Sequence, residues 1–249
     1  MNIIIFDTET ISVDKPFCYN IGYTVVEVET RTYLAHRDFV VEQIWHNIPL
    51  FNTAYYADKR PLYVSAMRGK RATLDKWGYI MRIMRNDIKA YNVEGVYAYN
   101  SLFDDRVMEY NNDWYKTINP IETIPIYDIR GYAIEYLVDE KYKEFCDKYG
   151  FYTESGNYST TAEVMYRYLM NNPTFEEAHT ALADAEIETE ILFACLNAGA
   201  TIGTVYKVPR SIEKEYDRHL VVKEGGKVLF ETDCKKITVS KDKQTITLK

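Results

Sequence analysis

The sequence predicts an α/β protein that consists of a main body and a small C-terminal β-meander. Three observations support this fold class. The chain begins with a short run that is apolar at consecutive positions, which is typical of a central strand. Further strand-like runs then alternate with segments whose apolar residues recur at helical spacing. From His219 onward, short β-rich runs alternate with turn signals.

The body begins with three predicted strands. Residues 2–7 form the first and central one, and residues 19–28 and 33–41 follow, with a turn at residues 29–31. The stretch of residues 45–72 is expected to be irregular or partly helical.

Helices and short strands alternate through the rest of the body. Apolar residues at helical spacing between Leu74 and Tyr91 indicate an amphipathic helix. A strand is predicted over residues 94–99, a helix over residues 102–110 and a short strand over residues 124–129. Helices then dominate up to Gly199.

The predicted domains are a body of residues 1–204 and a β-rich extension of residues 205–249. The extension carries the runs HLVV, KVLFE, KITVS and QTITL, with turns at residues 224–226 and 241–243. The net charge of −7 divides into −11 for the body and +4 for the extension. An acidic body argues against a non-specific coating of nucleic acid and is compatible with cations bound by clustered carboxylates.

Composition favours an ordinary soluble protein of the cytoplasm. The 249 residues can bury one sizeable core, and 47% are hydrophobic and 27% charged. The four cysteines are scattered, which predicts neither a zinc site nor a disulfide framework and fits a reducing compartment. No signal peptide and no membrane span is expected, so no membrane partner is predicted.

The first candidate site lies at the end of the predicted central strand, where Asp7, Thr8, Glu9 and Thr10 follow one another. Side chains alternate along an extended chain, so Asp7 and Glu9 point the same way. Two neighbouring carboxylates repel each other unless a cation lies between them. A solvated strand end that leads into a turn is the alternative interpretation.

The second candidate site is the segment NSLFD, in which Asn100 and Ser101 are both suited to begin a helix. Asp104 would lie one turn inside that helix, on the apolar face beside Phe103 and Val107. An acidic first turn that the helix dipole favours explains the segment nearly as well.

The third candidate site is the segment HTALADA, which leads into a predicted helix. The expected buried stripe of this helix consists of Ile187, Ile191, Ala194 and Ala198. Asp184 extends the stripe, and a carboxylate on a core face is costly unless it is paired or bound to metal. His179 would diverge from Asp184 on a continuous helix, unless it lies in the preceding turn, where Thr180 could cap. A lone histidine that is satisfied or exposed is the alternative.

Together these residues form a chemical inventory. Four carboxylates from separate elements suit two hard cations such as Mg²⁺ or Mn²⁺. A neutral histidine near pH 7 can accept the proton of an attacking water. The inventory indicates phosphodiester hydrolysis.

The three motifs resemble those of the DEDDh exonuclease family, which includes DnaQ-like proofreading subunits and RNA-trimming enzymes. DTET matches the first motif, NSLFD the second and HTALADA the third, in the family's order and over residues 1 to about 199. A histidine five residues before the final aspartate, rather than a tyrosine four before it, indicates the h subgroup. Many members follow the first motif with Thr-Gly, where this chain has Ile11 and Ser12.

The resemblance implies a ribonuclease-H-like fold with a mixed five-stranded sheet flanked by helices. It implies two divalent cations, Mg²⁺ or Mn²⁺, and nucleoside 5′-monophosphates as products. The implied metal ligands are Asp7, Glu9, Asp104 and Asp184, and the implied general base is His179. The residues implied to contact nucleic acid near the terminal nucleotide are Thr8, Glu9, Thr10, Asn100 and Phe103.

Residues 55–71 combine basic and aromatic side chains, which attract phosphates and stack on bases. The basic residues are Lys59, Arg60, Arg68, Lys70 and Arg71, against the single acid Asp58. This segment is a candidate strand-binding loop, and a solvated loop with incidental charges is the alternative.

The sequence therefore predicts a two-metal 3′→5′ exonuclease that acts on the 3′ end of single-stranded DNA or RNA. One alternative is a proofreading or accessory subunit of a polymerase or other complex, docked on a protein partner through the C-terminal extension. The other is a non-catalytic nucleic-acid-binding protein on the same fold. The intact carboxylates and His179 argue against the last alternative.

Overall fold

The computed structural model describes residues 1–209, 211–213, 218–224, 227–234, 237–239 and 246–248. The chain divides into two compact units, one of Met1–Gly150 and Thr160–Pro209 and the other of Phe151–Ser159 and Arg210–Lys249. The domain boundary placed after residue 204 stays a prediction. No helix in the described part of the chain has the length and apolar character that a transmembrane segment requires.

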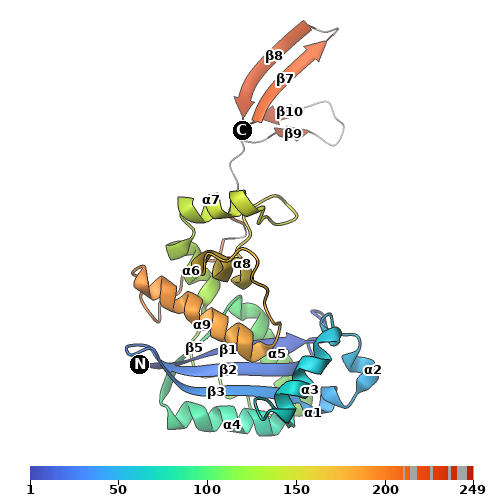
Figure 1. The fold of residues 1–249 in the computed structure, drawn as a ribbon, viewed down its shortest axis with the longest axis vertical. Coiled ribbons are helices and arrows are strands. Elements are labelled where there is room, and N and C mark those ends of the chain that lie inside the picture. The colour runs from blue at the N-terminus through green and yellow to red at the C-terminus, as the bar shows by residue number, and fades with distance from the viewer. Residues whose placement is uncertain (210, 214–217, 225–226, 235–236, 240–245, 249) are drawn as a thin grey trace. The chain divides into compact units, whose positions relative to one another are not determined.

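A mixed sheet forms the centre of the first unit, with the strand order β4-β3-β2-β1-β5-β6 (Figure 1). Its strands are β1 (Asn2–Thr10), β2 (Cys18–Glu27), β3 (Thr32–Val41), β4 (Thr73–Asp75), β5 (Val93–Ala98) and β6 (Ile126–Asp128). β2 runs antiparallel to both β1 and β3, whereas β5 is parallel to β1 and β6 is parallel to β5. The predicted mixed sheet is confirmed. It has six strands rather than the expected five, because β4 adds a short parallel edge strand beside β3.

Helices cover both faces of this sheet. The helices of this unit are α1 (Glu42–Trp45), α2 (Ile48–Phe51), the 3₁₀ helix η1 (Ala57–Lys59), α3 (Arg60–Arg68), α4 (Trp77–Ala90), α5 (Ser101–Tyr115), α6 (Ile129–Leu137), α7 (Glu140–Tyr149), α8 (Ala162–Leu169) and α9 (Ala181–Asn197), not all of which contact the sheet. α9 lies across β1 and β2 on one face, and α4 lies on the opposite face (Figure 1). The expected irregular stretch of residues 45–72 therefore contains three short helical segments besides the end of α1.

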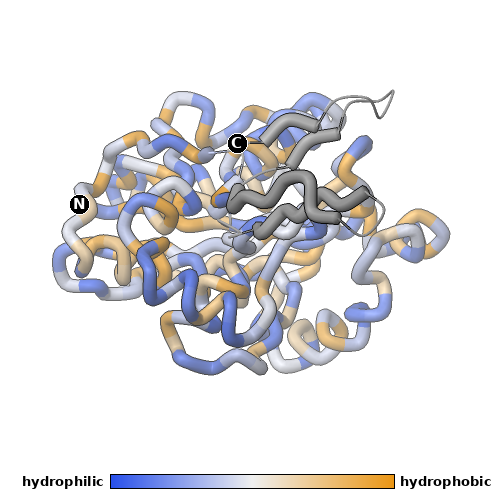
Figure 2. The backbone as a smooth tube through the Cα atoms, turned by 90° about the horizontal axis from the view of Figure 1, so that it is seen from above, coloured by the Kyte–Doolittle hydropathy of each residue, from blue (hydrophilic) through white to orange (hydrophobic). Residues whose placement is uncertain are grey.

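Burial explains the apolar run in β1. Residues 3–6 are fully buried because both faces of the central strand are covered. α4 buries Trp77, Met81 and Met84 of the predicted stripe, whereas Leu74 lies in β4 and Tyr91 lies beyond the end of the helix. Figure 2 shows hydrophobic and hydrophilic residues alternating along helices at the edge of the first unit, as one-sided burial requires.

The stripe predicted for the last helix is only partly right. Ile187 and Ile191 are buried, but Ala198 is exposed because α9 ends at Asn197. Burial is not confined to one stripe, and Leu192 is also fully buried. The reason is that α9 packs on the sheet and also on α6 and α8.

Each β-rich run of the second unit contains a strand, namely β7 (Arg218–Glu224), β8 (Lys227–Cys234), β9 (Ile237–Val239) and β10 (Ile246–Leu248). Among the described residues these strands form two separate antiparallel pairs, β7 with β8 and β9 with β10, rather than one meander. Of the predicted turns, residues 225–226 and 241–243 lie outside the described residues.

Candidate active site

β1 carries the first two acidic residues. The strand continues to Thr10, three residues beyond its predicted end, so Asp7 and Glu9 lie within it and on the same side. Both are half-buried, and the hydroxyl of Tyr19 donates to Oε2 of Glu9 over 3.3 Å. Burial raises the pKa of Asp7 to about 7, and burial together with the charge of Asp7 raises the pKa of Glu9 to about 9.

Asp104 lies in the first turn of α5 and is almost completely buried, with 3% of its surface exposed. The backbone N–H and the hydroxyl of Thr8 both donate to Oδ1 of Asp104, over 3.1 and 2.6 Å. Burial and the charge of Asp7 raise the pKa of Asp104 well above its ordinary value. Thr8 is itself buried, so its polar groups orient this carboxylate between β1 and α5.

Two residues of β2 fix the start of α9 against the sheet. The side-chain oxygen of Asn20 accepts the backbone N–H of Ala181 over 2.8 Å, and this contact satisfies one free donor at the helix N-terminus. Thr180, the expected cap, makes no such side-chain bond. At Gly22, a Cβ atom would lie 2.0 Å from the backbone nitrogen of Leu182, so only glycine permits this close approach.

This approach brings the third motif to the first one. Asn20 and Gly22 pair directly with Glu9 and Asp7 in the antiparallel register of β1 and β2. The first turn of α9 therefore lies beside the two acidic residues of the central strand, and that turn contains Asp184.

Asp184 is a buried carboxylate with unmet hydrogen-bonding capacity. It is 8% exposed, and its Oδ1 atom is buried without a hydrogen-bond partner. Burial, followed by the charges of Asp7 and Glu177, raises its pKa to about 10. A buried ionised carboxylate without a partner is strongly destabilising unless a cation compensates it.

His179 lies in the turn that precedes α9, with a left-handed backbone at φ 51°. Its ring stacks on that of Tyr56, with 4.1 Å between the ring centroids and 13° between the planes. Its carbonyl oxygen accepts the hydroxyl of Tyr63 over 3.2 Å. Burial, with the nearby charge of Lys59, lowers the pKa of His179, which favours a neutral ring.

The structure thus brings together residues that lie far apart in the sequence. One ligand atom each of Glu9, His179 and Asp184 lies within 4.8 Å of the others. The charge of Asp7 raises the pKa of Glu9, Asp104 and Asp184. The four acidic residues, called the carboxylate cluster below, offer the oxygen ligands that hard divalent cations prefer. The free Oδ1 atom of Asp184 and the unbalanced charge both fit bound cations.

Sequence reasoning missed two further acidic residues. Glu188 is 3% exposed, accepts the backbone N–H of Tyr99 and has a pKa raised well above its ordinary value by burial and by Asp7. Glu177 has a buried Oε1 atom without a partner, and its Oε2 atom lies 3.9 Å from Nδ1 of His179. Spacing could have indicated Glu188, which follows Asp184 by one helical turn. No local pattern marks Glu177.

The other residues expected near the terminal nucleotide have varied surroundings. Asn100 is exposed in a left-handed conformation, and its N–H donates to Asp128. Phe103 is half-buried beneath the guanidinium group of Arg106. The hydroxyl of Thr10 donates to the carbonyl oxygen of Ser12. Their contact with nucleic acid stays a prediction.

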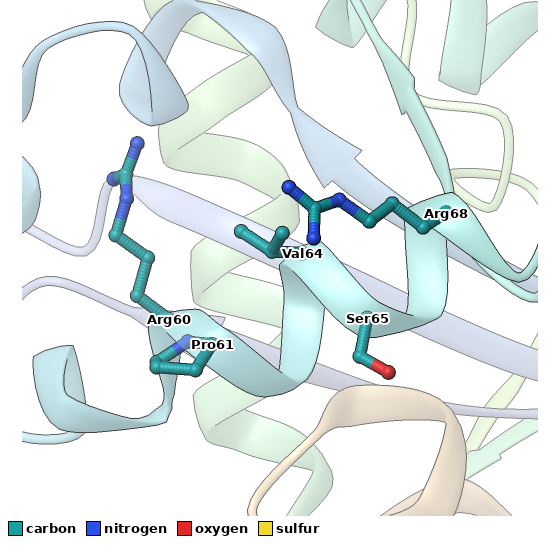
Figure 3. A pocket seen from close by; sticks show the side chains of 5 residues that line it. All are labelled: Arg60, Pro61, Val64, Ser65 and Arg68. Atoms are coloured by element: carbon teal, nitrogen blue, oxygen red, sulfur yellow. The ribbon is translucent and has the colours of Figure 1, made fainter.

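The basic residues of residues 55–71 differ in how exposed their side chains are. The guanidinium group of Arg60 lies 3.7 Å from the ring centroid of Trp45 and donates to the carbonyl oxygen of that residue. Arg68, Lys70 and Arg71 are exposed. A shallow pocket on α3 is lined by Arg60, Pro61, Val64, Ser65 and Arg68 (Figure 3). Both arginine side chains extend to the same side of the helix, and the guanidinium group of Arg68 lies beside Val64 (Figure 3).

No protein-family model matches the sequence, and no curated protein matches it significantly. The fold, however, is similar to solved exonuclease structures. The nuclease domain of 3′hExo, a DEDDh family member bound to rAMP, aligns with a TM-score of 0.51 and 13% identity over 80% of this chain and 92% of that chain.

A full-length 3′-exonuclease also aligns with a TM-score of 0.51 and 13% identity, over 85% of this chain and 68% of that chain. E. coli exonuclease I in complex with a dT13 oligonucleotide aligns with a TM-score of 0.49 and 16% sequence identity. That alignment covers 80% of this chain and 41% of that chain. The two alignments with a TM-score of 0.51 show that this chain shares the fold of those exonuclease structures.

Proposed function

We propose that this chain is a metal-dependent 3′→5′ exonuclease that hydrolyses single-stranded DNA or RNA and releases nucleoside 5′-monophosphates. One observation supports the proposal: Glu9, His179 and Asp184, from separate segments, each offer a ligand atom within 4.8 Å of the others, and the charge of Asp7 acts on Glu9, Asp104 and Asp184. Among the ion pairs of the described residues, none joins a member of the carboxylate cluster to lysine or arginine. Unbalanced buried charge of this kind is typical of a functional site.

In this proposal Asp7, Glu9, Asp104 and Asp184 hold two divalent cations, Mg²⁺ or Mn²⁺. Such cations, when bound, supply the positive charge that stabilises the attacking and leaving oxygens of a phosphodiester. The protein contributes the fixed arrangement of the ligands. Thr8 holds Asp104 through two hydrogen bonds, and Asn20 holds the start of the helix that carries Asp184.

His179 acts in the proposal as the general base. Its lowered pKa keeps the ring neutral near pH 7, so that it can accept a proton from the attacking water. Nδ1 of the ring lies 3.9 Å from Oε2 of Glu177.

The basic segment is proposed to guide the strand toward this site. The exposed Arg68, Lys70 and Arg71, with Lys59, offer positive charge in an otherwise acidic body, and phosphates are attracted to such charge. Arg60 is proposed to hold this segment against the body of the protein, since its guanidinium group packs on Trp45. Thr10, Asn100 and Phe103 are proposed to contact the terminal nucleotide.

The proposal is tested with 5′-end-labelled single-stranded DNA, duplex DNA and RNA, incubated with Mg²⁺ or Mn²⁺ and resolved by size. The wild type should shorten the 5′-labelled single strands stepwise, which gives a ladder of labelled products, and Asp7→Ala should leave them at full length. Asp113→Ala, which alters an exposed carboxylate on α5, serves as the matched control and should retain activity. Equal cleavage by Asp7→Ala and the wild type would refute the assignment.

A further inference from the structure

Two tyrosines outside the three motifs hold His179 from separate directions. The ring of Tyr56 lies nearly parallel to the imidazole ring at 4.1 Å, and the hydroxyl of Tyr63 donates to the histidine carbonyl oxygen over 3.2 Å. The first contact restrains the plane of the ring, and the second restrains the backbone. Both tyrosines come from the segment around η1 and α3, more than 100 residues before the histidine.

His179 needs such external support because its own backbone gives little. It lies outside α9, and its φ of 51° is a left-handed conformation that a residue with a Cβ atom adopts only at an energetic cost. The χ2 torsion of histidine is broad, so the ring would turn easily if nothing packed against it. Surrounding contacts must therefore determine both the backbone and the ring.

The tyrosine that holds the backbone is itself firmly packed. Tyr63 is 1% exposed and lies edge-on to Tyr19 and Trp45, with ring centroids 5.9 and 6.3 Å away. The hydroxyl of Tyr19 in turn donates to Glu9. Tyr63 thus contacts His179, and Tyr19, which packs on Tyr63, contacts Glu9. The distance between His179 and Glu9 therefore depends on the packing of these two rings.

We propose that Tyr56 and Tyr63 are positioning residues for the general base of this enzyme. Tyr63 fixes the backbone of His179, and Tyr56 fixes the ring plane beside Glu9 and Asp184. The inference rests on the proposed function, in which His179 accepts the proton of the attacking water. A displaced base weakens proton transfer in the transition state but not substrate binding, so loss of these contacts should lower kcat and leave KM unchanged.

Matched substitutions separate ring stacking from the hydroxyl. Tyr56→Phe keeps the stacked ring and should retain kcat within about twofold, whereas Tyr56→Leu should lower kcat roughly 10- to 100-fold. Tyr63→Phe removes only the hydroxyl that bonds the histidine carbonyl and should lower kcat by about tenfold. Tyr79→Leu is the control, because this half-exposed tyrosine lies on α4, on the opposite face of the sheet from α9.

A second measurement is independent of activity. The chain has four histidines, so its imidazole C–H signals in a proton NMR spectrum are few, and the signal of His179 is the one lost in His179→Gln. A ring stacked at 4.1 Å should shift this signal upfield in the wild type and in Tyr56→Phe. The shift should disappear in Tyr56→Leu and persist in Tyr79→Leu.

Loss of the shift in Tyr56→Leu together with a lower kcat and an unchanged KM would support the proposal. An unchanged His179 signal in Tyr56→Leu would overturn it, and so would a variant whose KM rises while kcat stays constant. A wild-type chain that shows the shift but cleaves no nucleic acid would overturn the proposed function and leave the stacking contact supported.

Discussion

Replacing Asp184 by asparagine is expected to stabilise the metal-free protein while it abolishes nuclease activity. Burial and the charges of Asp7 and Glu177 raise the pKa of Asp184 to about 10, against about 3.9 for an unperturbed aspartate. Because the folded-state pKa is the higher one, ionisation of Asp184 opposes folding above about pH 4, and stability falls as the pH rises toward 10. Asparagine keeps the shape of the side chain and removes the charge.

The size of the gain in the free energy of unfolding depends on the pH at which stability is measured. About 3 pH units separate neutral pH from the ordinary pKa of an aspartate, which corresponds to at most ~4 kcal/mol. Part of this gain is offset, because the buried amide group of asparagine lacks full hydrogen bonding, at a cost of about 1–3 kcal/mol. We expect a net gain of about 1–3 kcal/mol, or roughly 3–9 °C in the Tm of the first unit.

Thermal unfolding in the presence of EDTA, followed by circular dichroism at pH 7 and pH 5, measures this gain. The gain should be smaller at pH 5, because the raised pKa of Asp184 costs the wild type less stability at pH 5 than at pH 7. Mg²⁺ or Mn²⁺ should stabilise the wild type more than the variant, since the variant lacks one ligand. Asp113→Asn, an exposed change on α5, should leave the Tm unchanged in every condition. A variant less stable than the wild type in EDTA at pH 7 would refute the reasoning.

Three further predictions concern the base and the start of α9. The pKa of His179 is lowered by burial and by Lys59, so the acid limb of the pH–kcat profile should lie below pH 6.5 and move to higher pH in Lys59→Gln; an unmoved limb would contradict the assignment. Gly22→Ala would place a methyl group 2.0 Å from a backbone nitrogen of α9, so we expect a lower Tm and greatly reduced activity. A variant with wild-type values in both assays would show that α9 does not lie so close to β2. Asn20→Ala should lower the free energy of unfolding by about 1–2 kcal/mol in urea titrations, because the N–H of Ala181 loses its acceptor; no change would mean that water replaces the cap.

Local patterns in the sequence were sufficient to predict the framework of the first unit. The apolar run of residues 3–6 identified the central strand, because a strand covered on both faces has no polar side. The apolar spacing of α4 identified an amphipathic helix for the same kind of reason. Candidate acidic residues were visible because each lies where a predicted strand or helix begins or ends. The sixth strand was missed, since three edge residues carry no distinct period.

Charge and residue type did not reveal how a side chain is used. Arg60 is predicted to contact nucleic acid, and only the structure shows that its guanidinium group packs on Trp45. Thr8 is predicted to contact nucleic acid, and only the structure shows that it also donates twice to Asp104. The sequence gives the chemical groups of each residue, whereas the contacts of these groups depend on which residues lie nearby in the folded chain.

The sequence by itself determined the order and type of the main elements and the inventory of acidic residues and histidine. Only the tertiary structure decided how that inventory is assembled. Asn20 contacts Ala181 across 161 positions, and Gly22 lets the helix approach β2. The physical reason is that periodicity reports burial along a single element, while the spacing of charges and rings in a site is set by packing between elements far apart in the chain.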